Sequence, residues 1–152
     1  MKTFFTLVIL GAALFWDGDP DKVLGRWHTP EDKSIIEIFK CDDRYCGKIV
    51  DLKEKVYPDD DGRGMAGTPK VDRDNPDEKL RKRPIIGLEL MSGFSFNGSS
   101  WTGGTIYDPE SGKTYKCKMR IREDGALVVR GYVGISLIGR TSVWQRPPAE
   151  EP

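Results

Sequence analysis

The fold of this chain is decided by residues 34–52, which read SIIEIFKCDDRYCGKIVDL. Apolar and polar side chains alternate on either side of Asp42-Asp43, a pair that suits a tight turn. A two-residue turn at that point sets Glu37 directly opposite Lys48, where the two charges attract each other across the strands. The same register gathers large apolar side chains on the opposite face, namely Ile36, Ile38, Tyr45 and Ile49. Residues 34–52 are therefore predicted to form an antiparallel β-hairpin with one buried face.

Further alternating segments follow along the chain, separated by turns rich in Gly, Asn and Asp. The strands expected from this pattern are Leu24–Thr29, Ser34–Lys40, Tyr45–Leu52, one resuming at Ile85, Trp101–Tyr107, Lys113–Ile121, Ala126–Tyr132 and Thr141–Gln145. Most of them follow one another as sequential hairpins. We therefore predict an all-β fold, an eight-stranded antiparallel up-and-down β-barrel, which has room for one small ligand.

Residues 53–83 interrupt the strand pattern with a long polar segment, which is expected to act as a lid or entrance. Within it, Asn75 can cap a helix, Pro76 suits the first helical position and Glu78 completes a capping box. Pro84 ends that pattern, so one short helix of about two turns is expected.

The same segment contains two groups of acidic residues. Asp59, Asp61 and Gly64 imitate the start of a calcium loop, but Arg63 and Lys70 stand where that loop needs oxygen ligands. The second group consists of Asp72, Asp74 and Asp77. A solvated acidic loop is the expected role of both, with weak surface calcium binding as the alternative.

An apolar run from Phe4 to Trp16 follows Lys2 at the N-terminus. At about a dozen residues it is shorter than the roughly 20 that span a bilayer, and it fits a secretory signal. We expect residues 1–20 to be a signal peptide, 21–148 the barrel domain and 149–152 a frayed tail. A membrane anchor or a buried segment is the alternative for the N-terminus. The expected location is periplasmic or secreted, which is an oxidising environment.

Composition disfavours several classes of protein. Lys plus Arg and Asp plus Glu both total 24, so the basic excess of a nucleic-acid binder is missing. The chain has three Cys and one His, too few for a typical tetrahedral zinc site, and we expect neither metal nor cofactor. Cys41 and Cys46 lie diagonally on the outer face of the predicted hairpin and are a candidate disulfide. Cys117 is expected to be a buried, inert thiol.

Several short motifs in a fixed order resemble one bacterial secreted family, domain of unknown function 2147, whose fold is lipocalin-like. The resemblance covers about Leu24 to Arg146. The motifs are Gly25-Arg26-Trp27, Tyr45-x-Gly47-Lys48-Ile49-Val50, Asp74-Asn75-Pro76-Asp77 with Leu80-Arg81, Arg83-Pro84-Ile85-Ile86-Gly87-Leu88, Trp101-x-Gly103-Gly104, Tyr107-Asp108-Pro109, Gly112-Lys113-Thr114-Tyr115-x-Cys117, Arg130-Gly131-Tyr132-x-Gly134 and Gly139-Arg140-Thr141-x-x-Trp144.

That resemblance implies a fold and no activity, because the family has none assigned. In lipocalins, the Trp of a Gly-x-Trp motif in the first strand closes the base of the barrel, and an Arg in the last strand stacks on that Trp. Trp27 matches that Trp, and Arg140 or Arg146 matches the Arg; of the two we assign Arg140. Trp144 is expected to help close the barrel.

We predict an exported carrier that binds a small apolar or amphipathic ligand inside the barrel. Tyr115, Cys117 and Met119 form the best interior stripe, and Gly103-Gly104 beside it favours a cavity. The full set of expected ligand-facing residues is Trp27, Ile38, Tyr45, Leu88, Tyr107, Tyr115, Cys117, Met119 and Tyr132. A filled core is the alternative for this stripe.

Two other functions stay open at this point. One is an envelope-associated binding module that meets an acidic protein or polymer through its outer surface. The basic face of Lys116, Lys118 and Arg120, or the charged segment Lys79–Arg83, would serve it. The other is an enzyme, which would have to use His28, but no catalytic residue is assigned.

Overall fold

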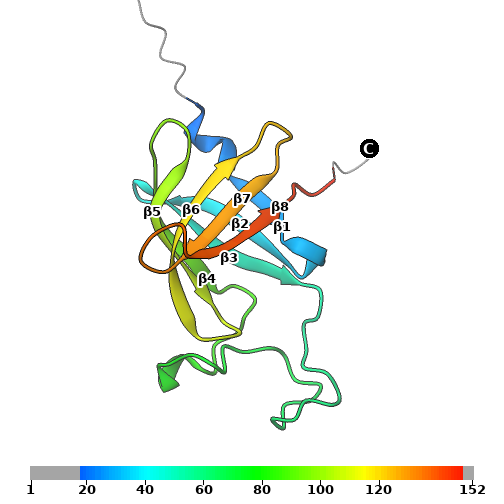
Figure 1. The fold of residues 1–152 in the computed structure, drawn as a ribbon. Coiled ribbons are helices and arrows are strands. Elements are labelled where there is room, and N and C mark those ends of the chain that lie inside the picture. The colour runs from blue at the N-terminus through cyan, green and yellow to red at the C-terminus, as the bar shows by residue number, and fades with distance from the viewer. Residues whose placement is uncertain (1–17, 149–152) are drawn as a thin grey trace, which may run out of the picture.

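The computed structural model describes residues 18–148, which form one antiparallel sheet curled into a barrel (Figure 1). Eight strands follow one another in chain order around the sheet. Between the last strand and the first, His28 and Gln145 exchange backbone N–H···O bonds of 2.7 and 3.0 Å, which closes the barrel. The strands are β1 (Gly25–His28), β2 (Ser34–Cys41), β3 (Arg44–Leu52), β4 (Glu89–Phe96), β5 (Trp101–Asp108), β6 (Lys113–Ile121), β7 (Leu127–Tyr132) and β8 (Gly139–Trp144). The predicted fold class is confirmed.

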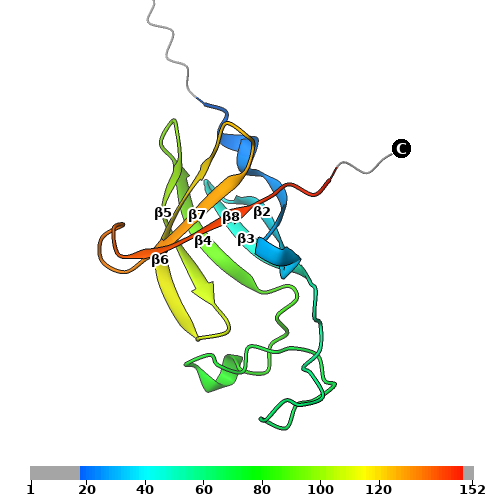
Figure 2. The same cartoon turned by 45° about the vertical axis from the view of Figure 1, so that its right-hand side comes forward.

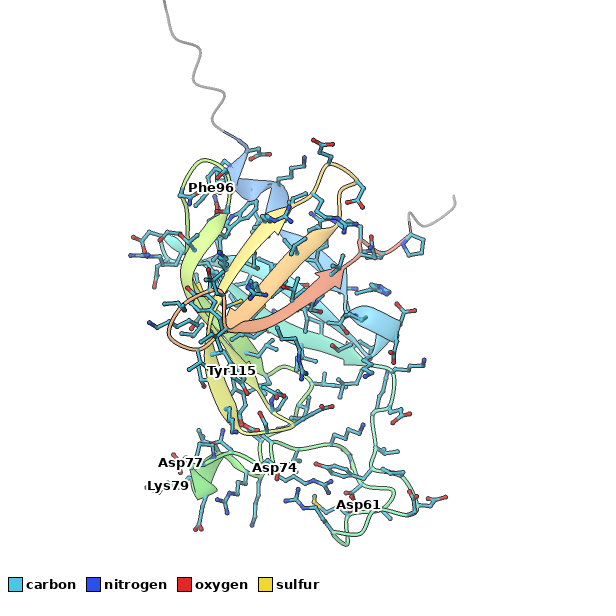
Figure 3. The ribbon with its side chains drawn as sticks, viewed as in Figure 1. Asp61, Asp74, Asp77, Lys79, Phe96 and Tyr115 are labelled. Atoms are coloured by element: carbon cyan, nitrogen blue, oxygen red, sulfur yellow. A yellow bond between two sulfur atoms is a disulfide. The ribbon has the colours of Figure 1, made fainter. Side chains whose placement is uncertain are left out.

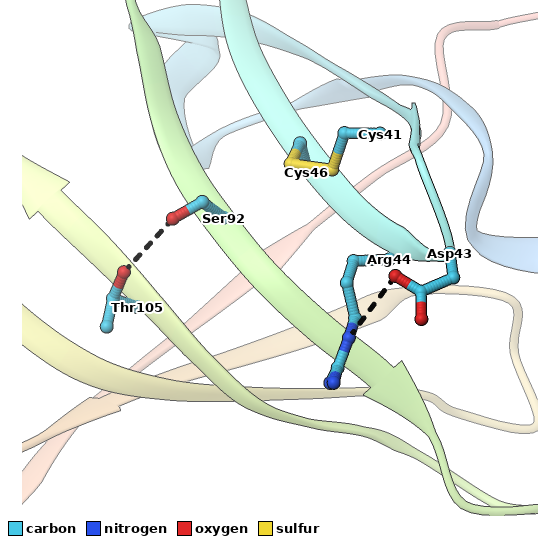
Figure 4. Close-up of a disulfide and its surroundings, with 6 residues drawn as sticks. All are labelled: Cys41, Asp43, Arg44, Cys46, Ser92 and Thr105. Atoms are coloured by element: carbon cyan, nitrogen blue, oxygen red, sulfur yellow. Dashed lines mark hydrogen bonds and ion pairs between the residues drawn. A yellow bond between two sulfur atoms is a disulfide. The ribbon is translucent and has the colours of Figure 1, made fainter.

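The β2–β3 hairpin has the register that its sequence predicts. Ile36 pairs with Ile49 and Glu37 with Lys48, whose side chains form a 3.3 Å ion pair. Beside the turn, Cys41 and Cys46 are joined in a disulfide (Figure 4). This link is diagonal across the hairpin, because Cys46 lies opposite Phe39 in the register.

A single turn of 3-10 helix, η1 (Pro20–Val23), covers one end of the barrel (Figure 1). Val23, the last residue of this turn, is fully buried. Indole N–H groups fasten the turn from inside, since Trp27 donates to the Val23 carbonyl at 2.8 Å and Trp101 to the Pro20 carbonyl at 3.1 Å. The Tyr45 hydroxyl adds a 2.8 Å bond to Asp21. We call this the closed end of the barrel.

The interior next to the closed end is filled. Phe94 is completely buried, and its ring occupies the space beside Gly104, where an added Cβ would lie only 2.5 Å from ring carbons. The prediction that Gly103-Gly104 leaves a cavity is therefore wrong at this point. Glycine is needed at 104 because Phe94 takes its volume.

Two predictions about residues 53–100 are also wrong. Instead of a two-turn helix there is only the 3-10 turn η3 (Glu78–Leu80), capped by Asp77. Asn75 is not the N-cap, because the turn begins two residues later than expected; the Asn75 side-chain oxygen accepts the Asp77 backbone N–H at 2.8 Å, and its amide donates to Asp72 and Tyr107. β4 begins at Glu89 rather than Ile85, since Gly87 has a φ of 93° and breaks the extended chain; Ile86 is consequently exposed.

Below the strands, residues 53–88 form a long loop that hangs across the end opposite η1 (Figures 1 and 2). It has little regular structure besides the turn η3 and two isolated bridges, Val56–Pro69 and Val71–Pro84. A second 3-10 turn, η2 (Pro30–Asp32), connects β1 to β2. Within residues 18–148, no helix has the length and apolar character needed to cross a bilayer.

Candidate ligand-binding cleft

A cleft of about 1480 Å³ opens at the end of the barrel opposite η1. Its walls come from the barrel interior, from the long loop and from the β5–β6 and β7–β8 connections. Tyr115 lies in the lower barrel, while Asp61 and Asp74 lie in the loop beneath it (Figure 3). The barrel is therefore packed near η1 and hollowed at the opposite end. We call that end the open end.

The inner part of the cleft is mostly apolar. Its lining side chains from the barrel strands and the segment leading into β4 are Ile49, Leu52, Ile85, Leu90, Ile106, Tyr115, Val129 and Trp144. Gly131 of β7 also lines it, and a Cβ at this position would meet Ile106 and Tyr115 only at ordinary contact distances of 3.5 and 3.7 Å. This surface could bind an apolar group by the hydrophobic effect.

Arg140 is a cation on the interior side of the open end. It pairs with Gly131, which pairs in turn with the buried Cys117, so the alternation places Arg140 on the inward face of β8. The side chain lines the cleft and is solvent-exposed. Among residues 18–148 it has no ion-pair partner. A guanidinium in this position can receive a carboxylate or phosphate.

The acidic side chains of the loop part of the cleft are mostly matched by cations. Asp61 is held by Arg73 at 2.9 Å and Asp74 by Arg63 at 2.7 Å. The backbone N–H of Met65, together with Arg73, holds the pKa of Asp61 below its usual value. The described residues contain no cluster of three or more potential metal ligands. These carboxylates stabilise the loop by holding arginines.

A buried polar network ties the loop to the barrel. Asp72 is fully buried and accepts a 2.6 Å bond from the Tyr107 hydroxyl and a 2.8 Å bond from the Asn75 amide. Arg83 completes the set with two nitrogens, each 2.8 Å from the same Asp72 oxygen. Because Tyr107 belongs to β5, this network fixes residues 72–83 against the rim of the open end.

A close backbone contact supports the same attachment. Gly112, in the β5–β6 turn, has a φ of 69°, and a Cβ there would lie 2.0 Å from the Asp74 carbonyl oxygen. Only glycine meets both conditions, because it has no Cβ and tolerates positive φ.

The residues that the sequence assigned to the ligand are now divided into three groups. Tyr115 lines the cleft from the inward face of β6. Tyr107 also lines the cleft, but its register partner Thr114 places it on the outer face of β5, where its hydroxyl bonds to the long loop, so its expected position inside the barrel is wrong. Tyr132 does not line the cleft, and its register partner Lys116 places it on the outer face, so its expected interior position is wrong. The others are buried in the packed core, where a ligand in the cleft would not touch them: Trp27, Ile38, Tyr45, Leu88, Cys117 and Met119.

Arg146, rather than Arg140, stacks on the barrel-closing tryptophan. Its guanidinium carbon lies 3.8 Å from the centre of the Trp27 ring, and its nitrogens donate to the carbonyls of Lys22 and Leu24 at 2.7 and 2.8 Å. The assignment of Arg140 to this role is therefore wrong. Trp144 is buried in the core but also borders the cleft, so it lies toward the open end.

The structure also shows the surroundings of Cys117 and His28, the two residues that the sequence analysis considered for chemical reactivity. Burial raises the pKa of Cys117 to about 12, so this thiol stays protonated and poorly nucleophilic. His28 lies on the seam between β1 and β8, with Nδ1 2.9 Å from an Asp32 carboxylate oxygen. The nearby hydroxyls of Thr29 and Ser34 bond to each other at 3.0 Å.

Two tyrosines predict a loss of stability in strong alkali. Burial, followed by a bond to a carboxylate, raises the pKa of both Tyr45 and Tyr107 from 10.0 to about 12. A raised folded-state pKa stabilises the fold fully below pH 10 and loses that contribution as pH rises through 12. We expect the free energy of unfolding, measured with urea, to fall over this window. Tyr107→Phe should flatten part of the fall in the free energy of unfolding; a variant with the same pH dependence as the parent protein would contradict the assignment.

Comparison with known proteins agrees with this geometry. The family model described as "Uncharacterized protein conserved in bacteria (DUF2147)" matches residues 25–146, and the chain belongs to that family. Among solved structures, the chain is similar to protein HP1028 from Helicobacter pylori, which is described as belonging to the lipocalin family. The two are 24% identical over 84% of each chain, with a TM-score of 0.69, a likeness that establishes a lipocalin-like fold. No curated protein matches the chain.

Proposed function

We propose that this protein binds an amphipathic ligand in the cleft, with an apolar portion inside the barrel and an anionic group at Arg140. The observation that carries the proposal is a guanidinium on the inward face of β8 that has no ion-pair partner among residues 18–148, beside the apolar inner part of a cleft of about 1480 Å³. Burial of apolar ligand surface contributes about 25 cal/mol per Å² before the costs of binding are subtracted. The lipocalin-like fold supports a binding role rather than catalysis.

We also propose that the protein works outside the cytoplasm, in the periplasm or secreted. The Cys41–Cys46 disulfide supports this location, because such links persist in oxidising compartments. The expected signal, residues 1–20, lies mostly outside the described residues. Cell fractionation with mass measurement of the mature N-terminus tests the proposal, and an intact N-terminus on cytoplasmic protein would contradict it.

Binding of a fluorescent polyene fatty acid below its micelle concentration tests the cleft directly. We expect saturable binding by the purified protein, competed by an unlabelled fatty acid. Arg140→Gln should weaken binding by about tenfold, because hydrogen bonds to charged groups are worth about 1.5–3 kcal/mol and 1.4 kcal/mol corresponds to tenfold. Native mass spectrometry of the same preparation should show any ligand that copurifies.

Matched variants separate the cleft from the outer surface. Arg120→Gln removes an exposed arginine from the outer face of β6 and should leave fatty-acid binding unchanged. Gly131→Val adds volume beside Ile106 and Tyr115 and should reduce binding while preserving the fold. The proposal would be contradicted if the protein showed no saturable fatty-acid binding, or if Arg140→Gln and Arg120→Gln weakened fatty-acid binding equally.

A further inference from the structure

The β7–β8 loop, residues 133–138, exposes a group of large apolar side chains. Val133, Ile135, Leu137 and Ile138 are 62, 59, 84 and 66% exposed. Figures 1 and 2 both show this loop projecting away from the barrel wall. Single exposed apolar residues are ordinary, but four within six consecutive residues form a patch that usually marks an interaction site.

The two strands that carry this loop, β7 and β8, and the neighbouring strand β6 have charged side chains of positive sign only. The segments 113–121, 127–132 and 133–144 contain no Asp or Glu, although the whole chain has equal numbers of acidic and basic residues. Their cations are Lys113, Lys116, Lys118, Arg120, Arg130 and Arg140. We call the outward members, Lys116, Lys118, Arg120 and Arg130, the basic face. Its positive potential attracts an anionic surface.

The register places two of these cations side by side on the outer face. Lys118 lies directly opposite Arg130, and like charges in such a cross-strand pair repel each other. Tyr132, whose register partner is Lys116, adds an amphipathic ring between the basic face and the apolar loop. The apolar side chains of the β7–β8 loop, the ring of Tyr132 and the cations of the basic face therefore follow one another. Apolar, aromatic and cationic groups have the same order across a membrane–water interface.

We propose that the β7–β8 loop inserts into the surface of a bilayer containing anionic lipids while the basic face contacts the phosphates. A protein partner fits less well, because a standard protein interface uses about 20–30 residues on each side, whereas the apolar patch has four.

The loop also borders the cleft, since Val133 and Ile138 are among its lining residues. Docking would therefore bring the mouth of the cleft next to the lipid. The docking itself does not require that the cleft hold a ligand, so vesicle binding and fatty-acid binding can fail independently.

Flotation with lipid vesicles tests the proposal on the protein as purified from cells. We expect stronger binding to phosphatidylcholine vesicles containing phosphatidylglycerol than to phosphatidylcholine alone. The double variant Ile135→Asp/Leu137→Asp should reduce the partition coefficient by about tenfold or more. Lys116→Glu/Lys118→Glu should reduce it by about fivefold or more per cation and remove the preference for anionic lipid.

Matched controls use exposed residues on the long loop. Val56→Asp/Ile86→Asp places two acidic residues at other exposed apolar positions, and Lys79→Glu/Lys82→Glu reverses two other exposed charges. Because all variants share one N-terminal segment, their differences report the β7–β8 loop and the basic face. Equal losses in test and control variants would overturn the proposal, as would full competition by soluble glycerol phosphate. A concentration-dependent dimer abolished by Ile135→Asp/Leu137→Asp, with vesicle binding unchanged, would assign the patch to a second copy and overturn it as well.

Discussion

Replacing Trp27 by alanine is expected to lower the free energy of unfolding by about 3–5 kcal/mol, the usual cost of truncating a large buried aromatic residue. Trp27 is 1% exposed and donates to the Val23 carbonyl, so the variant loses both core packing and a contact that holds η1. Urea denaturation followed by circular dichroism measures the change. Ligand binding at the open end should be retained in whatever fraction stays folded.

The arginine that stacks on Trp27 provides the control for this prediction. Arg146→Ala should also destabilise the fold, because it removes the guanidinium from the Trp27 ring and from two backbone carbonyls. Arg140→Ala, which removes an exposed arginine of β8 without these contacts, should leave stability nearly unchanged. Equal losses from Arg146→Ala and Arg140→Ala, or a Trp27→Ala variant as stable as the parent, would contradict this account of the closed end.

The barrel could be predicted because its strands alternate with a period of two and its turns are chemically distinct. The β2–β3 register follows from one turn and one charge pair, Glu37 and Lys48, and the structure reproduces it. The inward face of β6 follows from alternation alone, with Cys117 and Met119 buried. Both inferences depend only on residues close together in the sequence, because turn residues and the alternation of side chains determine the register of a hairpin and the inward face of a strand.

The sequence predictions are wrong in two situations. In one, a single residue interrupts the alternation of a strand. In the other, the role of a side chain depends on a partner that is distant in the sequence. Gly87 breaks the extended chain before β4, so the strand expected to resume at Ile85 begins only at Glu89, and Ile86 is exposed. The sequence pattern predicts an inward Tyr132, but its register partner Lys116 places it on the outer face. Motif spacing could not choose between Arg140 and Arg146, because the choice depends on which one reaches Trp27.

The attachment of the long loop could not be found from sequence. The sequence predicts a solvated Asp72, yet this side chain is fully buried against Tyr107, which lies 35 residues further along the chain. Asn75, expected to begin a helix, instead donates to both of those side chains. Such contacts depend on how the loop folds back on the barrel, and no local periodicity reports that path.

Asp72→Ala is expected to cost about 3 kcal/mol and to loosen residues 53–88 from the barrel. Removing one partner of a buried ion pair typically costs about 3–5 kcal/mol. We expect the lower end because the Arg83 side chain is 36% exposed and can be partly solvated. The loss should be local as well as global, with faster hydrogen exchange and protease cleavage in the loop before the strands unfold.

The double variant Asp72→Ala/Arg83→Met separates loss of charge balance from loss of packing. It should be less destabilised than Asp72→Ala alone, because no guanidinium is then left without its carboxylate. Asp60→Asn, at an exposed position of the same loop, should change neither exchange nor cleavage. Because the loop supplies Tyr57 and Arg73 to the cleft wall, Asp72→Ala should also weaken fatty-acid binding. If the loop stayed protected in Asp72→Ala, the buried network would not be what holds it, and the shape of the cleft would depend on the Gly112 contact and the Arg63–Asp74 pair instead.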